Sequence, residues 1–267
     1  MRATVQISSR DNPHLKEARR VRDGKEREKI FIEGARLVKE AVRAGLEIEM
    51  LFLSKDGVFR AGELLETETS AGIFQVTDSA LSSISDTVTS QGVLAIASRP
   101  APGQGKVEQG LANAAVPVVA FLHQTNNPSN LGAVIRTADA AGAAGVIVSS
   151  GSADAFSPKA LRAAMGSSFR LPVWADADLS DVLRWAEGKD LQTVATEIGA
   201  TRSYADIDWT RPTLLLLGSE AHGLPKGEME EVDEKIMIPM ETSVESLNLA
   251  VACGVILFEA RRQNSLG

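Results

Sequence analysis

The chain of 267 residues has 44% hydrophobic and 24% charged side chains, which is typical of a globular protein and excludes a largely disordered one. It has no run of 18 apolar residues, no signal-peptide pattern at its start and a single cysteine, so we expect a soluble cytoplasmic protein without disulfides. The net charge of −7 disfavours a nucleic-acid partner, yet residues 1–60 hold 14 basic and 10 acidic side chains. On charge alone, this net +4 indicates either an RNA-binding segment or solvated helix faces.

Helical and strand-like patterns alternate over the first hundred residues. Apolar residues recur at helical spacing over 13–24 and 33–45, and Gly45 is placed to end the second helix. Short apolar runs predict strands at 48–53, 73–76 and 92–97, with a polar helix near 62–67. This order predicts a small α/β domain over residues 1–98.

Residues 99–116 are rich in proline and glycine and have little periodicity, which predicts a linker. Beyond it, apolar runs of strand length alternate with helical patterns. The predicted strands are 117–122, 146–148, 191–195, 213–217 and 235–238, and the predicted helices are 131–141, 158–165, 181–187, 228–232 and 247–263. Strands that are apolar throughout indicate a parallel sheet covered on both faces, so we expect a parallel-sheet α/β domain over 117–267, with ligands at the carboxyl ends of its strands.

The sequence lacks the motifs of several common cofactor-binding and catalytic sites. There is no G-x-G-x-x-G after a predicted strand, no Lys followed by Ser or Thr, and no G-x-S-x-G. These absences disfavour a nucleotide-dependent oxidoreductase, a P-loop enzyme and a serine hydrolase. The three histidines lie far apart in the sequence, which disfavours a metal site. The candidates that remain are polar loops that follow the strands.

Three such loops carry a distinctive set of residues. The first loop leads into N-x-G-x-x-x-R, from Asn130 to Arg136; the second is L-G-S-E, from Leu217 to Glu220; the third holds I-P-M from Ile238 and then S-L-N, from Ser246 to Asn248. Taken together and in this order, they resemble the three motifs of the SpoU/TrmH family of RNA 2′-O-ribose methyltransferases, in the SPOUT superfamily. The stretch FIEGARLVKEAVRAG at 31–45 also resembles the ribosomal-protein-like RNA-binding domain that precedes the catalytic domain in many members.

The resemblance implies S-adenosylmethionine as methyl donor, a trefoil knot in the C-terminal domain, and a homodimer with active sites close to its interface. It matches the cofactor-binding positions of the family to Gly218, Ile238 and Leu247, and further candidates are Leu217, Ala195 and Thr196. Loop backbones of this kind suit an uncharged adenine ring, which forms hydrogen bonds with peptide groups. For Ile238 and Leu247, core packing is the alternative interpretation.

The family's proposed catalytic residue matches Arg136. A guanidinium group keeps its proton in proteins, so we expect Arg136 to hold a phosphate and stabilise the developing alkoxide rather than to act as a base. Asn130 could orient the arginine or the substrate, Glu220 could pair with a cation or hydroxyl, and Ser246 and Asn248 could hold polar groups of the ribose or cofactor. Simpler roles, a helix cap for Asn130 and a solvated charge for Glu220, stay open here.

These residues predict an enzyme that methylates a ribose 2′-hydroxyl in RNA, and the N-terminal domain favours ribosomal RNA. A transfer-RNA methyltransferase and an antibiotic-resistance methyltransferase of ribosomal RNA are alternatives with the same architecture. A noncatalytic RNA-binding or ribosome-assembly factor is the alternative from a different class. His222 is a candidate for a group that accepts a proton near neutral pH, although a plain loop position is the favoured interpretation.

Overall fold

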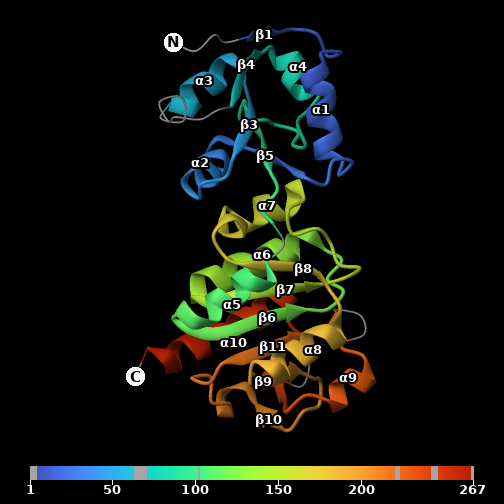
Figure 1. Ribbon diagram of the computed structural model, residues 1–267, viewed down its shortest axis with the longest axis vertical. Helices are drawn as coiled ribbons and strands as arrows, with labels where there is room; N and C mark the ends of the chain where they lie inside the picture. The colour runs from blue at the N-terminus through green and yellow to red at the C-terminus, as the bar shows by residue number, and fades with distance from the viewer. Residues whose placement is uncertain (1–4, 63–70, 102, 220–222, 242–245, 266–267) are drawn as a thin grey trace. The chain divides into compact units, whose positions relative to one another are not determined.

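The computed structural model describes residues 5–62, 71–101, 103–219, 223–241 and 246–265 (Figure 1). Contacts within the chain divide it into two compact units. The first unit consists of Met1–Ala101 and Phe156–Phe169, and the second of Pro102–Ala155 and Arg170–Gly267. No helix of the described ranges is long and apolar enough to cross a membrane.

The first unit is built on a five-stranded sheet in the order β1-β4-β3-β5-β2, in which β5 is antiparallel to both of its neighbours. The strands are β1 (Val5–Ile7), β2 (Lys29–Glu33), β3 (Ile48–Leu53), β4 (Gly72–Val76) and β5 (Val93–Ser98). Its helices are α1 (Pro13–Arg22), α2 (Ala35–Arg43), α3 (Lys55–Ala61), α4 (Asp78–Ser82) and α7 (Pro158–Ala164). Apolar residues of α1 and α4, among them Leu15 and Leu81, form one core with Phe31, Phe52 and Phe74 of the sheet.

Most of the elements predicted for this unit are confirmed, with one correction at Glu33. The predicted strands at 48–53, 73–76 and 92–97 match β3, β4 and β5 to within a residue. Glu33, however, ends β2 instead of opening a helix, and α2 starts only after Gly34, whose φ of +105° breaks the helical pattern. Of the helix predicted near 62–67, residues 63–67 lie outside the described ranges.

The second unit contains a seven-stranded sheet in the order β10-β12-β9-β11-β6-β7-β8, and every described pairing in it is parallel. Its strands are β6 (Val116–Leu122), β7 (Ala143–Ser149), β8 (Val173–Ala177), β9 (Gln192–Thr196), β10 (Arg202–Ser203), β11 (Thr213–Leu217) and β12 (Glu234–Met237). Its helices are α5 (Gln104–Asn113), α6 (Pro128–Ala141), α8 (Leu179–Gly188), α9 (Lys226–Glu230) and α10 (Leu249–Asn264). The parallel-sheet prediction is therefore confirmed, while β8, β10 and α5 have no counterpart in the predicted elements.

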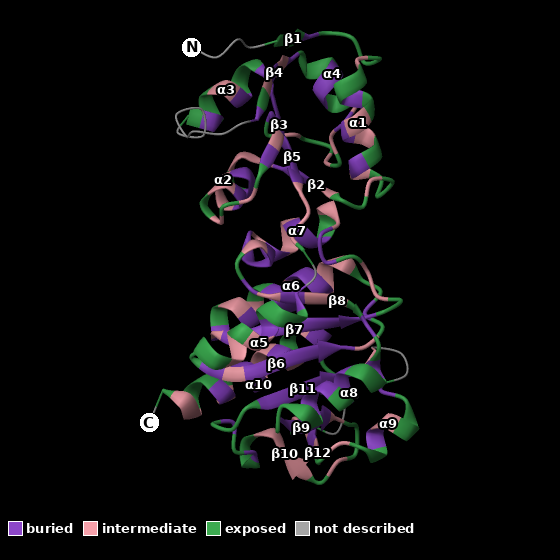
Figure 2. Cartoon of the chain, viewed as in Figure 1, coloured by how far each residue is buried: buried purple, intermediate pink, exposed green. Residues whose placement is uncertain are grey.

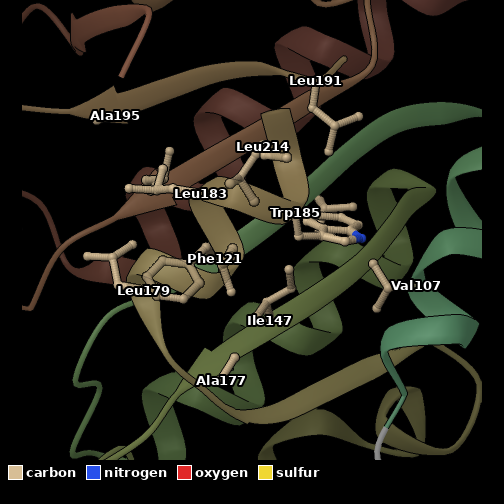
Figure 3. Packing of buried hydrophobic residues seen from close by; sticks show 14 of the residues in the cluster. Val107, Phe121, Ile147, Ala177, Leu179, Leu183, Trp185, Leu191, Ala195 and Leu214 are labelled. Carbon is tan, nitrogen blue, oxygen red and sulfur yellow. The ribbon is translucent and has the colours of Figure 1, made fainter. Parts of the chain in front are cut away.

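The central strands β6, β7 and β11 are buried on both faces (Figure 2). Alternate residues of β6 and β11, such as Phe121 and Leu214, face a core that also contains residues of α5, α8 and α9 (Figure 3). The residues between them, such as Ala120 and Leu215, are equally buried and face the side of α6 and α10, because side chains alternate along a strand. Because helices cover both faces of these central strands, the strands are apolar throughout, and the sequence pattern therefore predicted them.

Helix α5 lies where the sequence predicts a linker. A Cβ atom on Gly110 would lie 2.1 Å from the carbonyl oxygen of Ala144, so the glycine allows α5 to pack directly on the backbone of β7. Glu108 then fixes α5 to α8 by accepting hydrogen bonds from Trp185 Nε1 (3.0 Å) and Lys189 Nζ (2.9 Å). Gly110, one of the glycines that indicated a flexible segment, serves close packing instead.

Candidate active site

Five of the six predicted cofactor residues lie at the carboxyl ends of β9, β11 and β12, which are neighbours in the sheet, and the sixth, Leu247, lies just before α10. Strand register places Thr196 beside Ile236 and Ala195 beside Leu216, and Thr196 Oγ1 donates to the carbonyl oxygen of Leu216 at 3.4 Å. Leu217, Gly218 and Ile238 follow directly along β11 and β12. Residues that are separated by up to 43 positions in the sequence are thus collected at one edge of the sheet, as the prediction required.

Ser219 and Gly223, the described residues on either side of 220–222 after β11, are bonded to each other. Ser219 and Gly223 exchange two backbone hydrogen bonds of 3.1 and 2.9 Å, and Gly223 has a φ of +67°. A Cβ atom on Gly218 would lie 2.4 Å from the carbonyl carbon of Gly223 and 2.6 Å from the nitrogen of Leu224. Only glycine fits at position 218 without moving this backbone. Glu220 and His222 fall between these residues, outside the described ranges.

Helices α6 and α10 bring the first and third motifs together. Asn248 Nδ2 donates to Asn130 Oδ1 at 3.3 Å near the start of both helices, and Arg261 Nη1 donates to the carbonyl oxygen of Ala140 at 2.9 Å near their ends. The two helices therefore run parallel, side by side. Between these bonds, a Cβ atom on Gly254 would lie 3.2 Å from Thr137 Cγ2, so a glycine permits the close helix approach that holds the asparagines together.

The bond between the asparagines corrects one interpretation. The N-cap of α6 is Asn127, whose Oδ1 accepts a hydrogen bond from the backbone of Ser129 at 3.0 Å. Asn130 lies inside the helix and is not its cap. Asn248 caps α10 through Oδ1, which accepts from Ala250 N at 2.9 Å, and its Nδ2 group remains for Asn130. The N-termini of α6 and α10 are thus both capped without the Asn130 amide.

The remaining predicted residues differ in exposure. Arg136 is exposed on α6, and within the described part of the chain its guanidinium makes neither an ion pair nor a hydrogen bond. Ser246 and Leu247 are exposed directly before α10, with Leu247 at 37% exposure. Core packing, the alternative given for Leu247, is therefore wrong, whereas Ile238 is half-buried. Arg136, Ser246 and Leu247 are available to a ligand.

One group at this edge was missed by the sequence analysis. His123 follows β6, and its backbone N–H donates to the carbonyl oxygen of Leu217 at 3.0 Å. Its Nδ1 atom and the Oγ1 atom of Thr125 are buried without a hydrogen-bond partner in the residues that the structure describes, and Gln124 between them has a left-handed φ of +46°. Burial lowers the pKa of His123, and the nearby charge of Glu228 offsets part of this effect. Orphaned polar atoms and strained backbone are more frequent at functional sites, but composition gave no signal for them.

The fold and this edge define a class: an α/β protein whose parallel sheet gathers a ligand site from three loops at its carboxyl edge. Residues 117–258 match the SpoU rRNA Methylase family, and residues 12–95 match the MRM3-like substrate binding domain. The chain belongs to the SpoU rRNA methylase family.

Individual relatives extend the similarity beyond the catalytic motifs. The 23S rRNA (guanosine(2553)-2′-O)-methyltransferase RlmP of Bacillus subtilis is 34% identical, over 96% of this chain and 99% of the relative. The mitochondrial rRNA methyltransferase 3A of Danio rerio is 32% identical, over 88% of this chain and 64% of the relative. The crystal structure of the SpoU methyltransferase AviRb from Streptomyces viridochromogenes in complex with AdoMet superposes with a TM-score of 0.86 at 29% identity, covering 96% of this chain and 99% of that one.

Proposed function

We propose that this protein transfers a methyl group from S-adenosylmethionine to a ribose 2′-hydroxyl of ribosomal RNA. The observation that carries this proposal is the convergence of the three motifs, in which Asn130 and Asn248 are bonded although 118 residues separate them. The relatives reported above are named as rRNA methyltransferases, which favours ribosomal over transfer RNA. An intact polar set at this edge disfavours the noncatalytic alternative, because a binding factor has no need of it.

The residues at the edge fit the cofactor. Three large apolar side chains in the loops after β9 and β12 face solvent, with exposures of 83% for Ile198, 39% for Met240 and 37% for Leu247. Exposed apolar side chains and the backbone groups of Gly218 and Ile238, in loops of the same sheet edge, suit a flat heterocycle that needs both apolar contact and peptide hydrogen bonds. When bound, S-adenosylmethionine supplies an electrophilic methyl group. We assign its binding to Ala195, Thr196, Leu217, Gly218, Ile238 and Leu247.

The polar residues then have separate tasks in the transfer. Transfer would join the ribose oxygen to the methyl group as the methyl–sulfur bond of the bound cofactor broke, and the hydroxyl proton would pass to solvent or another acceptor. Arg136 stays protonated, so it holds an adjacent phosphate and stabilises negative charge on the attacking oxygen. The Asn130–Asn248 pair and Ser246 orient polar groups of the ribose or cofactor, and Glu220 pairs with a cation or hydroxyl.

We assign RNA binding to residues 1–98 and methyl transfer, with the trefoil knot, to residues 117–267; the predicted bounds need two changes, because Phe156–Phe169 pack with the first unit and the predicted linker contributes α5 to the second. The match of residues 12–95 to a substrate binding domain supports the first assignment. The excess of basic over acidic side chains in residues 1–60 favours contact with phosphates. With ribosomal RNA as substrate, we also propose that the protein acts in the cytoplasm.

We also propose a homodimer formed through α10. Val251 and Phe258 are 52% and 50% exposed and lie seven residues apart, so they share one side of the helix. In sedimentation velocity, we expect a dimer for the wild type and a monomer for Phe258→Asp, because a charge cannot enter an apolar interface without a partner. Val5→Asp, at an equally exposed valine on β1, should leave the dimer intact. A wild-type monomer, or a dimeric Phe258→Asp variant, would contradict this assignment.

The proposed activity is tested with labelled S-adenosylmethionine and unmodified transcripts of large-subunit, small-subunit and transfer RNA. We expect label in large-subunit RNA and one position in it that resists alkaline cleavage, because a 2′-O-methyl group removes the nucleophile of that cleavage. Label in transfer RNA would instead establish the alternative substrate. Cofactor binding without label in any transcript would indicate a ribosomal particle as substrate, and a protein that binds no cofactor would be a noncatalytic factor.

A further inference from the structure

A surface segment of the first unit, residues 85–92 between α4 and β5, is held by a buried carboxylate. Glu33 is only 7% exposed. Its Oε1 atom accepts hydrogen bonds from Ser85 Oγ (2.5 Å) and Thr87 Oγ1 (2.7 Å), and its Oε2 atom accepts from Asp86 N (2.9 Å). A carboxylate can be buried only when donors surround it, so these bonds fix the backbone of residues 85–87 in one conformation.

The other end of the segment is fixed as well. Gln91 accepts hydrogen bonds at Oε1 from Ala35 N (3.2 Å) and at its carbonyl oxygen from Arg60 Nη1 (3.0 Å). A Cβ atom on Gly57 would lie 1.9 Å from the carbonyl oxygen of Gly92, so α3 and the end of the segment are in backbone contact. Both flanks of residues 88–90 are therefore anchored to the sheet and its helices.

Val88 lies between the two anchored ends of residues 85–92 and has an exposure of 107%. A single exposed valine is ordinary on a protein surface. What requires an explanation is the combination of a fully exposed apolar side chain with a buried carboxylate that fixes the backbone beneath it. A rigid apolar tip loses little conformational entropy when it contacts a partner, which is the property of a preorganised binding element.

Two exposed arginines lie on the helices that anchor the segment at Gln91, and they indicate its partner. Arg36 is exposed at the start of α2, next to Ala35, and has no hydrogen bond or ion pair within the described ranges. Arg60 is exposed and uses one N–H group on Gln91, so its other donors are available. The only acid of residues 85–92, Asp86, is paired with Arg162 at 2.7 Å. Guanidinium groups on the helices that anchor an apolar tip match phosphates that accompany exposed base faces.

We propose that Val88, Arg36 and Arg60 form a contact surface for unpaired nucleotides of the RNA substrate. This inference rests on the proposed function and assigns its RNA recognition to one edge of the first unit. The valine packs against the face of an unstacked base, and the arginines hold the phosphates on either side. The surface selects and positions the substrate without touching the reacting atoms.

The test compares the full-length wild type with Val88→Asp and with Phe59→Asp as a matched control. Phe59 is 92% exposed on α3, and it lies two residues from Gly57, so it points away from the segment. For a large-subunit RNA transcript, we expect Val88→Asp to raise Kd at least about tenfold, since a carboxylate repels phosphates. Cofactor affinity and the single-turnover rate at saturating RNA should not change, and Phe59→Asp should bind RNA within about twofold of the wild type.

Arg36→Gln gives an independent measurement. Loss of one phosphate contact should lower the slope of log Kd against log salt concentration by about one. Wild-type affinity in Val88→Asp, an equal loss in Phe59→Asp, or a defect seen with ribosomal particles but not with the transcript would overturn the inference while leaving the proposed function intact. A wild type that neither binds nor methylates RNA would overturn both.

Discussion

Arg136→Ala should lower the single-turnover rate of methyl transfer by at least about a hundredfold, the usual effect of removing one donor to a developing oxyanion. The guanidinium is exposed on α6 and unpaired within the described residues, so its loss leaves no buried partner behind and should not destabilise the fold. Cofactor affinity should stay within about twofold, because the assigned cofactor residues lie on β9, β11, β12 and the start of α10. Rates at saturating RNA and cofactor measure this effect directly.

Two further variants show whether charge or geometry matters. Arg136→Lys keeps the charge but loses the planar fork, so its rate should lie between those of the wild type and the alanine variant. Arg184→Ala removes an exposed arginine from α8, far along the chain from the motifs, and should be as active as the wild type. Near-wild-type activity of Arg136→Ala would remove Arg136 from the reaction. If Arg136→Ala also lost cofactor binding, the role of Arg136 would be structural.

The fold was predictable where burial on two faces makes a strand apolar throughout. β11, with four leucines, and β3 were placed to the residue. The missed strand β8 contains Asp176 and half-exposed Trp174, because edge strands bury less and their composition is less distinctive. Helix α5 was missed because glycine carries two opposite meanings, flexibility and close packing, and only the contact of Gly110 with Ala144 decides between them.

The sequence named candidate site residues but not their arrangement. The family resemblance assigned Asn130 and Asn248 to one candidate site, yet only the parallel packing of α6 and α10 shows that they bond to each other. The unpartnered Nδ1 of His123 depends on which atoms of the fold surround it, and a one-dimensional pattern does not contain that information. Local chemistry is read from sequence, whereas burial of single atoms requires the three-dimensional structure.

Gly218→Ala should weaken S-adenosylmethionine binding by roughly five- to a hundredfold, which corresponds to the 1–3 kcal/mol that overpacking typically costs. The new methyl group would meet backbone atoms of Gly223 and Leu224 at 2.4–2.6 Å, and backbone cannot rotate away as a flexible side chain can. The backbone at Gly223 and Leu224 must therefore shift, and the peptide groups assigned to the cofactor move with it. Isothermal titration with S-adenosylmethionine measures the loss.

Gly227→Ala is the matched control, since a Cβ atom there meets nothing within 4 Å and α9 is otherwise unchanged. Alanine is also the better helix former, so this variant should bind the cofactor as the wild type does and unfold at an equal or higher urea concentration. Urea midpoints separate a local from a global effect: Gly218→Ala should remain folded under the titration conditions. If it bound S-adenosylmethionine as tightly as Gly227→Ala does, Gly218 would not be part of the cofactor site, whatever the motif suggests.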